Sequence, residues 1–288
     1  MGECGFTGFM ANLDTMGRRT SRHPARRIIA GSDARREVAT LAVEEPLEIR
    51  LGGRPFVVTM RTPGDDMDLA AGHLVSEGAI WNREHLPEIC YCTTVSGRAE
   101  QDYNTLTVTL SPDVPEPQSA RAGVMSSACG VCGVSSVDDV RRATHFPAES
   151  AEPMIDAEIL LSLPERLRDG QVVFGRTGGV HAAGLFSPDG ELLCLREDVG
   201  RHNAVDKVVG WALRDGRLPL RETILQVSGR ASFELVQKAS MAGIPLLSAV
   251  SAPSSLAVDL ASETGVTLVG FSRGDRATVY THPGRLRD

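Results

Sequence analysis

The feature that most constrains the fold is a regular alternation of strand and helix patterns after residue 222. Apolar runs of strand length occupy residues 222–229, 244–250 and 266–271, and helical patterns occupy residues 233–242 and 254–264 between them. Repeated β-α-β units imply parallel strands with helices that cover the sheet. We therefore expect an α/β domain over residues 151–288.

Two more elements are predicted upstream of this alternation. Residues 180–186 and 192–195 flank Pro188-Asp189-Gly190, a sequence typical of a turn, and together they predict a β-hairpin. Residues 201–214 follow with a helical pattern that ends before Gly216.

The N-terminal half of the chain reads as a separate, β-rich part over residues 41–118. Apolar residues alternate on both sides of Gly52-Gly53, which predicts a hairpin, and alternation returns at residues 103–110. A helix is expected between Asp65 and Gly78, because acidic residues favour its positive end and glycine its close. We expect an antiparallel sheet here.

A proline-rich connector at residues 111–117 marks the end of this β-rich part. Its three prolines exclude it from the interior of a sheet. Residues 119–150 are then expected to form a loop with a Cys-x-x-Cys motif, followed by a short helix that opens near Ser136.

Residues 1–40 form a basic arm. Seven arginines stand against four acidic residues here, which gives a charge of +3, while the rest of the 288-residue chain carries -10. Because the segment has little apolar patterning, we expect a flexible, solvated arm rather than a docking element.

Composition and charge exclude several classes of protein. A hydrophobic content of 42% and a charged content of 23% are ordinary for a globular chain, and the net charge of -7 argues against nucleic acid as a partner. Six cysteines occur without an apolar signal segment, so we expect the reducing cytoplasm and no membrane partner.

The motif Cys129-Gly130-Val131-Cys132 is the strongest indication of chemistry. Two thiols between small residues can be presented to a partner, and a helix start just downstream favours the reactive thiolate. Two alternatives remain open. With Cys90 and Cys92 this pair offers four thiolates for a structural zinc site, and by itself it can cycle as a dithiol oxidoreductase.

Several stretches together resemble the FdhD family of formate dehydrogenase accessory sulfurtransferases. The matching stretches are residues 127–133, 177–183, 196–207, 227–230 and 270–276. The resemblance implies a cytidine-deaminase-like α/β sandwich. It does not imply deaminase activity, because His181 is followed by Ala182-Ala183 and the glutamate base of a deaminase is missing.

The resemblance also implies a function for the two thiols. Cys129 matches the position that carries a persulfide, with Cys132 as its partner in catalysis. Sulfur would pass from a cysteine desulfurase to the molybdenum cofactor, as the bis(molybdopterin guanine dinucleotide), before its insertion into formate dehydrogenase. The resemblance further implies a homodimer, and we expect no permanent metal.

The family's cofactor-binding segment matches six consecutive residues. They are Phe271, Ser272, Arg273, Gly274, Asp275 and Arg276. The arginines can pair with phosphates, and the glycine permits close approach of the backbone. Without the resemblance, the same segment reads as a polar hairpin turn.

Other polar residues fall near predicted strand and helix ends, where α/β sheets place ligands. They are His181, Asp198, Arg201, His202, Lys207, Ser228 and Arg230. Some of them are expected to line one cleft. Residues 198–207 equally suit a cap and a hydrogen-bonded helix start.

Overall fold

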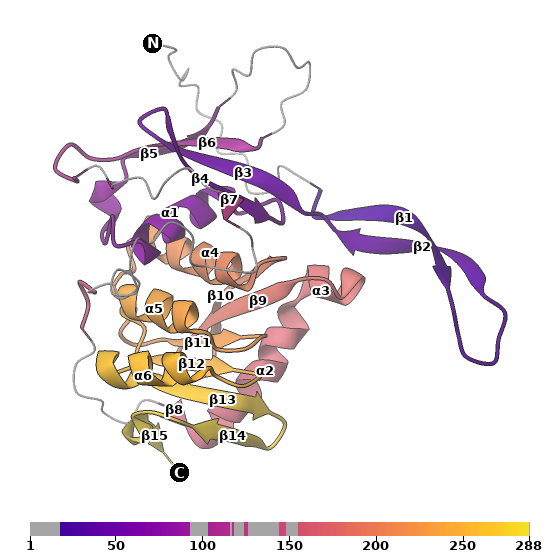
Figure 1. Cartoon of the computed structure of the whole chain (residues 1–288). Coiled ribbons are helices and arrows are strands. Elements are labelled where there is room, and N and C mark those ends of the chain that lie inside the picture. Colours follow the sequence, from indigo (N-terminus) through magenta and orange to yellow (C-terminus); the bar gives the residue numbers. More distant parts are fainter. Residues whose placement is uncertain are drawn as a thin grey trace.

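The computed structural model describes residues 18–92, 103–115, 117, 124–125, 144–147 and 155–287. These residues form a layered body with a long arm that projects from it (Figure 1). In the described residues no helix is long and apolar enough to cross a membrane.

A six-stranded sheet forms the centre of the body. Its order is β10 (Leu192–Asp198), β9 (His181–Phe186), β11 (Ile224–Val227), β12 (Leu246–Ala249), β13 (Thr267–Arg273) and β14 (Arg276–Val279). The three strands β11, β12 and β13 are parallel, and the other neighbours are antiparallel. The predicted β-α-β units and the predicted hairpin before them are confirmed.

Helices cover both faces of this sheet. On one face lie α4 (Arg201–Arg214), α5 (Phe233–Met241) and α6 (Ser255–Thr264), and on the other lies α2 (Ala157–Gly170), which is followed by α3 (Val172–Thr177). The predicted α/β sandwich is thus confirmed. Short pieces complete the body: β8 (Ile155–Asp156) pairs with β15 (Leu286–Arg287), and 3-10 turns occupy Arg83–His85 and Pro283–Arg285.

The sequence analysis did not predict α2. Pro164 lies inside this helix, and a proline removes one helical hydrogen bond. Leu160, Leu163 and Leu167 nevertheless lie on one side of it and are buried against the sheet. Burial of this leucine stripe outweighs the unfavourable proline.

The N-terminal part is a five-stranded sheet. Its order is β5 (Glu88–Tyr91), β6 (Thr105–Thr109), β3 (Glu45–Leu51), β4 (Arg54–Arg61) and β7 (Val124–Met125). The hairpin of β3 and β4 is confirmed, with Gly52 and Gly53 both at positive φ. The prediction of a purely antiparallel sheet is wrong, because β6 and β7 pair in parallel with β3 and β4. The connection through α1 (Asp66–Ser76) is long enough for the crossover that parallel pairing needs.

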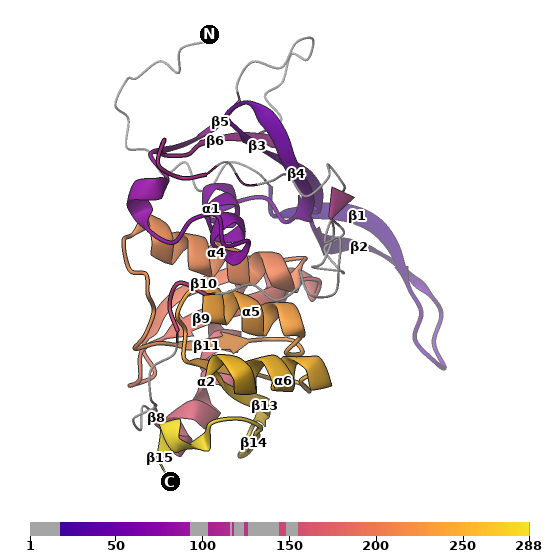
Figure 2. The ribbon, with the colours of Figure 1, turned by 60° about the vertical axis from the view of Figure 1, so that its left-hand side comes forward.

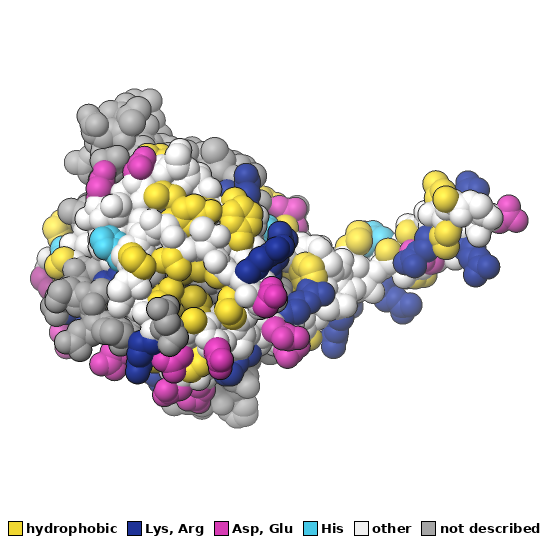
Figure 3. Space-filling view, turned by 90° about the horizontal axis from the view of Figure 1, so that it is seen from below, with side chains coloured by type: hydrophobic (Ala, Val, Ile, Leu, Met, Phe, Trp, Pro, Cys, Tyr) yellow, Lys and Arg dark blue, Asp and Glu magenta, His cyan; other side chains and the backbone are white. Residues whose placement is uncertain are grey.

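The arm is a β-hairpin over residues 20–42, so the expectation of a flexible segment over residues 1–40 is wrong for residues 20–40. Strands β1 (Thr20–Arg27) and β2 (Arg35–Ala42) pair over eight positions. Figures 2 and 3 show the hairpin extending well beyond the body. Its root is anchored by an ion pair between Arg19 and Asp65, 2.7 Å apart. Hydrogen bonds between the backbones of β1 and β2 order this segment. The expectation of flexibility rests on the lack of an apolar pattern, and such a pattern does not report backbone pairing.

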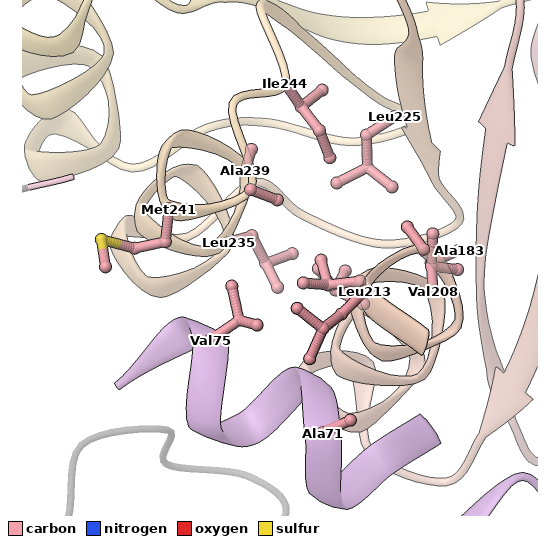
Figure 4. Packing of buried hydrophobic residues seen from close by; sticks show 14 of the residues in the cluster. Ala71, Val75, Ala183, Val208, Leu213, Leu225, Leu235, Ala239, Met241 and Ile244 are labelled. Atoms are coloured by element: carbon pink, nitrogen blue, oxygen red, sulfur yellow. The ribbon is translucent and has the colours of Figure 1, made fainter. Parts of the chain in front are cut away.

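The predicted parts at residues 41–118 and 151–288 share one hydrophobic core. The largest cluster of buried side chains runs from Leu47 in β3 to Leu268 in β13. Helix α1 packs on α4 and α5, with Ala71 and Val75 turned toward Leu213 (Figure 4). The two parts therefore stabilise each other across the proline-rich connector.

Candidate functional site

A pocket of about 760 Å³ lies between α2, α3 and the C-terminal ends of the parallel strands. Its walls are Pro164, Glu165, Leu167, Arg168, Gln171, Phe174, Gly178, Gly179, Val180, His181, Val199, Ser228, Val250, Arg273 and Gly274. The carboxyl ends of parallel strands are where α/β sheets usually bind ligands. The volume lies within the range of small-molecule sites.

Three stretches that are far apart in sequence meet at this pocket. Residues 178–180 form the turn after α3 and His181 begins β9. Ser228 follows β11, and Arg273 and Gly274 form the end of β13 and its turn. The expected cleft is present, and His181 and Ser228 line it. The other polar residues predicted for it are absent from its walls.

The segment from Phe271 to Arg276 is a hairpin turn that borders the pocket. Arg273 pairs with Arg276 across the ladder, and Gly274 has a φ of +61°. Phe271 has a φ of +53°, a backbone conformation that phenylalanine rarely adopts. Its side chain is 37% exposed to solvent. The hydroxyl of Ser272 is fully buried and has no hydrogen-bond partner among the described residues.

The surroundings of His181 favour its neutral form. Burial lowers the pKa of its imidazole, and the nearby Arg201 and His202 lower it further, against the opposing effect of Asp198. In the next strand position, the backbone N–H of Ala182 donates a hydrogen bond to the hydroxyl of Ser228 at 2.9 Å. The pocket wall at His181 therefore presents a ring that can form hydrogen bonds.

Asp198 and Lys207 are structural. The Lys207 ammonium lies 2.8 Å from the Asp198 carboxylate, and both side chains are fully buried. Asp198 also accepts hydrogen bonds from the backbone N–H groups of Thr62 and Gly200 and from the Asn203 amide. The interpretation of residues 198–207 as a hydrogen-bonded helix start is supported, but the predicted cap is wrong, because the N-cap residue of α4 is Gly200 and no side chain of the described residues caps the helix.

His202 lies in a separate buried cluster with two residues at the start of α5. Its Nε2 is 3.5 Å from the Ser232 hydroxyl and 3.7 Å from the Glu234 carboxylate. The nearby His202 is the main cause that lowers the pKa of Glu234 to about 2. Arg230 is exposed.

Glu197 is a structural residue of the site that sequence reasoning missed. Its two carboxylate oxygens accept hydrogen bonds from the backbone N–H groups of Val173 and Phe174, each at 2.8 Å. These are unpaired donors in the first turn of α3, which a carboxylate satisfies. Glu197 thereby fixes the pocket wall that carries Phe174. No sequence spacing relates Glu197 to α3, although it belongs to a stretch already singled out.

Comparison with known proteins decides the family. Residues 42–287 match the model of the FdhD/NarQ family. The chain belongs to the FdhD/NarQ family. Among its relatives, a protein from Nocardia farcinica named sulfur carrier protein FdhD is 54% identical over 94% of this chain and 96% of its own length. One of the same name from Streptomyces avermitilis is also 54% identical, over 94% of this chain and 97% of its own.

A solved structure is similar to this FdhD/NarQ-family chain over nearly its whole length. It is the crystal structure of a putative formate dehydrogenase accessory protein from Desulfotalea psychrophila. The sequence identity is 27% and the TM-score is 0.75, with 94% of this chain and 100% of the other covered.

The thiols of this FdhD/NarQ-family protein differ in environment. Cys129 and Cys132, predicted as catalytic, lie outside the described residues, as does the predicted helix near Ser136. Cys90 lies in β5, and Cys194 is buried in β10, where burial raises its pKa to about 12. Within the described residues there is no group of three or more His, Cys, Asp or Glu side chains that could hold a metal ion. The alternative zinc site includes Cys129 and Cys132, which lie outside the described residues, so it stays a prediction.

Proposed function

We propose that this chain is a sulfur carrier that serves formate dehydrogenase and that it acts as a sulfurtransferase through a cysteine persulfide. The curated relatives carry the name sulfur carrier protein, and the similar solved structure is of a putative formate dehydrogenase accessory protein. The observation that carries the proposal is the pocket, because His181, Ser228 and Arg273 of three family-like stretches meet there.

The first step loads sulfur on Cys129. Its thiolate attacks the outer sulfur of the persulfide held by a cysteine desulfurase. A new S–S bond forms at Cys129, the S–S bond of the donor breaks, and the donor cysteine leaves as a thiolate. No oxidant is needed, because the sulfane sulfur keeps its oxidation state.

The second step releases the sulfur. The Cys132 thiolate attacks Sγ of Cys129, which forms a Cys129–Cys132 disulfide and expels the terminal sulfur as hydrosulfide to the metal. The sulfur is reduced by two electrons, and the two thiols supply them. In a second route Cys132 only assists the loading step.

The pocket binds the acceptor, the molybdenum cofactor as its bis(molybdopterin guanine dinucleotide). Arg273 supplies a guanidinium for a phosphate, and Gly274 lets the backbone approach closely. Phe271 offers a ring face for stacking on a planar base. A pocket of about 760 Å³ suits one nucleotide portion of so large a ligand, so the remainder lies outside.

We further propose that the protein works in the cytoplasm as a homodimer. Its partners are then a cysteine desulfurase as donor and formate dehydrogenase as the enzyme that receives the sulfurated cofactor.

Intact-protein mass spectrometry tests the carrier role. The protein is incubated with a cysteine desulfurase and cysteine under non-reducing conditions. We expect a reducible gain of one sulfur that Cys129→Ala abolishes and that the control Cys90→Ala retains. Stoichiometric zinc with no gain of sulfur contradicts the proposal and supports the zinc site.

Calorimetric titration with GDP tests the pocket. Arg273→Ala removes the guanidinium at the pocket and should weaken GDP binding about tenfold or more, since a charge-assisted phosphate contact contributes about 1.5–3 kcal/mol. Arg230→Ala, at an exposed arginine outside the pocket, is the control. Equal affinities for wild type and Arg273→Ala would refute this assignment.

A further inference from the structure

The arm carries an unusual share of exposed apolar side chains. In the described residues nine large hydrophobic side chains are exposed, and four of them belong to this hairpin. Ile28 and Ile29 form its turn, 81% and 50% exposed, and Val38 and Leu41 on β2 are 56% and 45% exposed. Exposed apolar groups gathered on one projection mark a surface that another molecule covers.

The arginines of the arm also favour contact with an acidic partner. Residues 20–42 hold five arginines and two acidic residues. Arg26 lies opposite Arg36 in the ladder, and Arg27 lies opposite Arg35. Like charges directly opposite each other destabilise a hairpin. Within the part of the chain that the structure describes, Arg27 pairs with Glu37, and the other three arginines have no ion pair. An acidic surface against the arm removes this repulsion.

The isolated two-stranded sheet of the arm also favours contact with a partner. Its sheet contains only β1 and β2, so each strand has an open edge along its length. A two-stranded hairpin alone in water is marginally stable. In Figure 3 the outer half of the arm, with its arginines and apolar side chains, lies clear of the body. Among the described residues, none covers these side chains, and a partner would bury them.

We propose that the arm of one copy of this chain lies on the body of a second copy. Residues 43–288 carry a net charge of -10, whereas the arm carries +3, so the body complements the arm. In a two-fold dimer each arm binds the other body, and both hairpins are covered at once. The inference deepens the homodimer proposed above and names its contact surface.

The root of the arm lies at the rim of the pocket. The end of β2 lies beside α3, and the side chain of Ala42 is within 3.7 Å of the position that a Cβ at Gly179 would occupy. Gly179 lines the pocket. A second copy that follows the arm to its root therefore stands beside the pocket opening.

Sedimentation equilibrium of the full chain tests the proposal. We expect a mass of about twice 30.8 kDa for the wild type at micromolar concentration. Arg26→Glu with Arg36→Glu should raise the dissociation constant at least tenfold, and added salt should weaken the wild-type dimer. The control, Arg221→Glu with Arg230→Glu, makes the same change in charge at exposed positions of the body and should remain dimeric.

A second variant guards against a folding defect. Ile28→Ser with Ile29→Ser keeps every charge and should also weaken the dimer, with unchanged circular dichroism. A dimer that survives both arm variants overturns the arm as the contact, and a monomeric wild type overturns the dimer itself. A monomer that cosediments with phosphatidylserine vesicles through the arm overturns the second copy in favour of a membrane. None of these readouts depends on sulfur transfer.

Discussion

Gly72 of α1 lies directly against the backbone carbonyl of Asp206 in α4. A Cβ at Gly72 would stand 1.8 Å from that oxygen, and a Cβ at Gly210 would stand 1.8 Å from the carbonyl oxygen of Asp68. The two helices therefore meet backbone to backbone. This crossing joins the N-terminal part to the α/β sandwich.

Gly72→Ala should destabilise the protein although alanine favours helices. The obstacle is backbone, which cannot rotate away, so we expect a loss of about 3 kcal/mol or more. Urea unfolding followed by circular dichroism measures it. Gly284→Ala is the control, because no atom of the described residues lies within 4 Å of its Cβ position. Equal stability of both variants would contradict the close crossing.

Lys207→Met should cost about 3–5 kcal/mol of unfolding free energy, because it leaves the buried Asp198 carboxylate without its counter-charge. Chemical denaturation of the variant measures this loss. Arg287→Met breaks an exposed pair with Asp156, and this control should cost about 1 kcal/mol or less. If the two substitutions cost the same, the Asp198–Lys207 pair is not buried as described.

Glu197→Gln should loosen α3 while the sheet remains intact. A neutral amide replaces a carboxylate that accepts two backbone hydrogen bonds, and a bond to a charged group contributes about 1.5–3 kcal/mol. Hydrogen exchange should accelerate at the amides of Val173 and Phe174. The control Glu191→Gln, at an exposed turn, should leave these amides protected. If hydrogen exchange at these two amides is unchanged in Glu197→Gln, Glu197 does not hold the start of α3.

Cys194 should resist alkylation in the folded protein. Burial raises the pKa of its thiol to about 12, so at pH 8 almost none of it is the reactive thiolate. The raised pKa predicts increasing reaction only as the pH approaches 12. Peptide mass spectrometry after iodoacetamide treatment should find Cys194 unmodified at pH 8 and modified after unfolding in urea. Rapid labelling of the native protein would contradict its burial.

The sequence alone determined those elements whose signal is local. The β-α-β alternation after residue 222, the helix at Arg201–Arg214 and the hairpin about Gly52 and Gly53 follow from side-chain period and turn chemistry, which depend on neighbouring residues. The sequence also indicated His181 and Ser228 as polar groups near the ends of strands or helices, and both line the pocket.

Only the tertiary structure decided which distant segments meet. The parallel pairing of β6 with β3, the helix α2 around Pro164 and the bond from Thr62 to Asp198 depend on contacts between residues far apart in the chain. The same holds for the pocket. Local patterns carry no information on such contacts, because chain topology and close packing select them, and a buried polar group takes whichever partner the fold brings within reach.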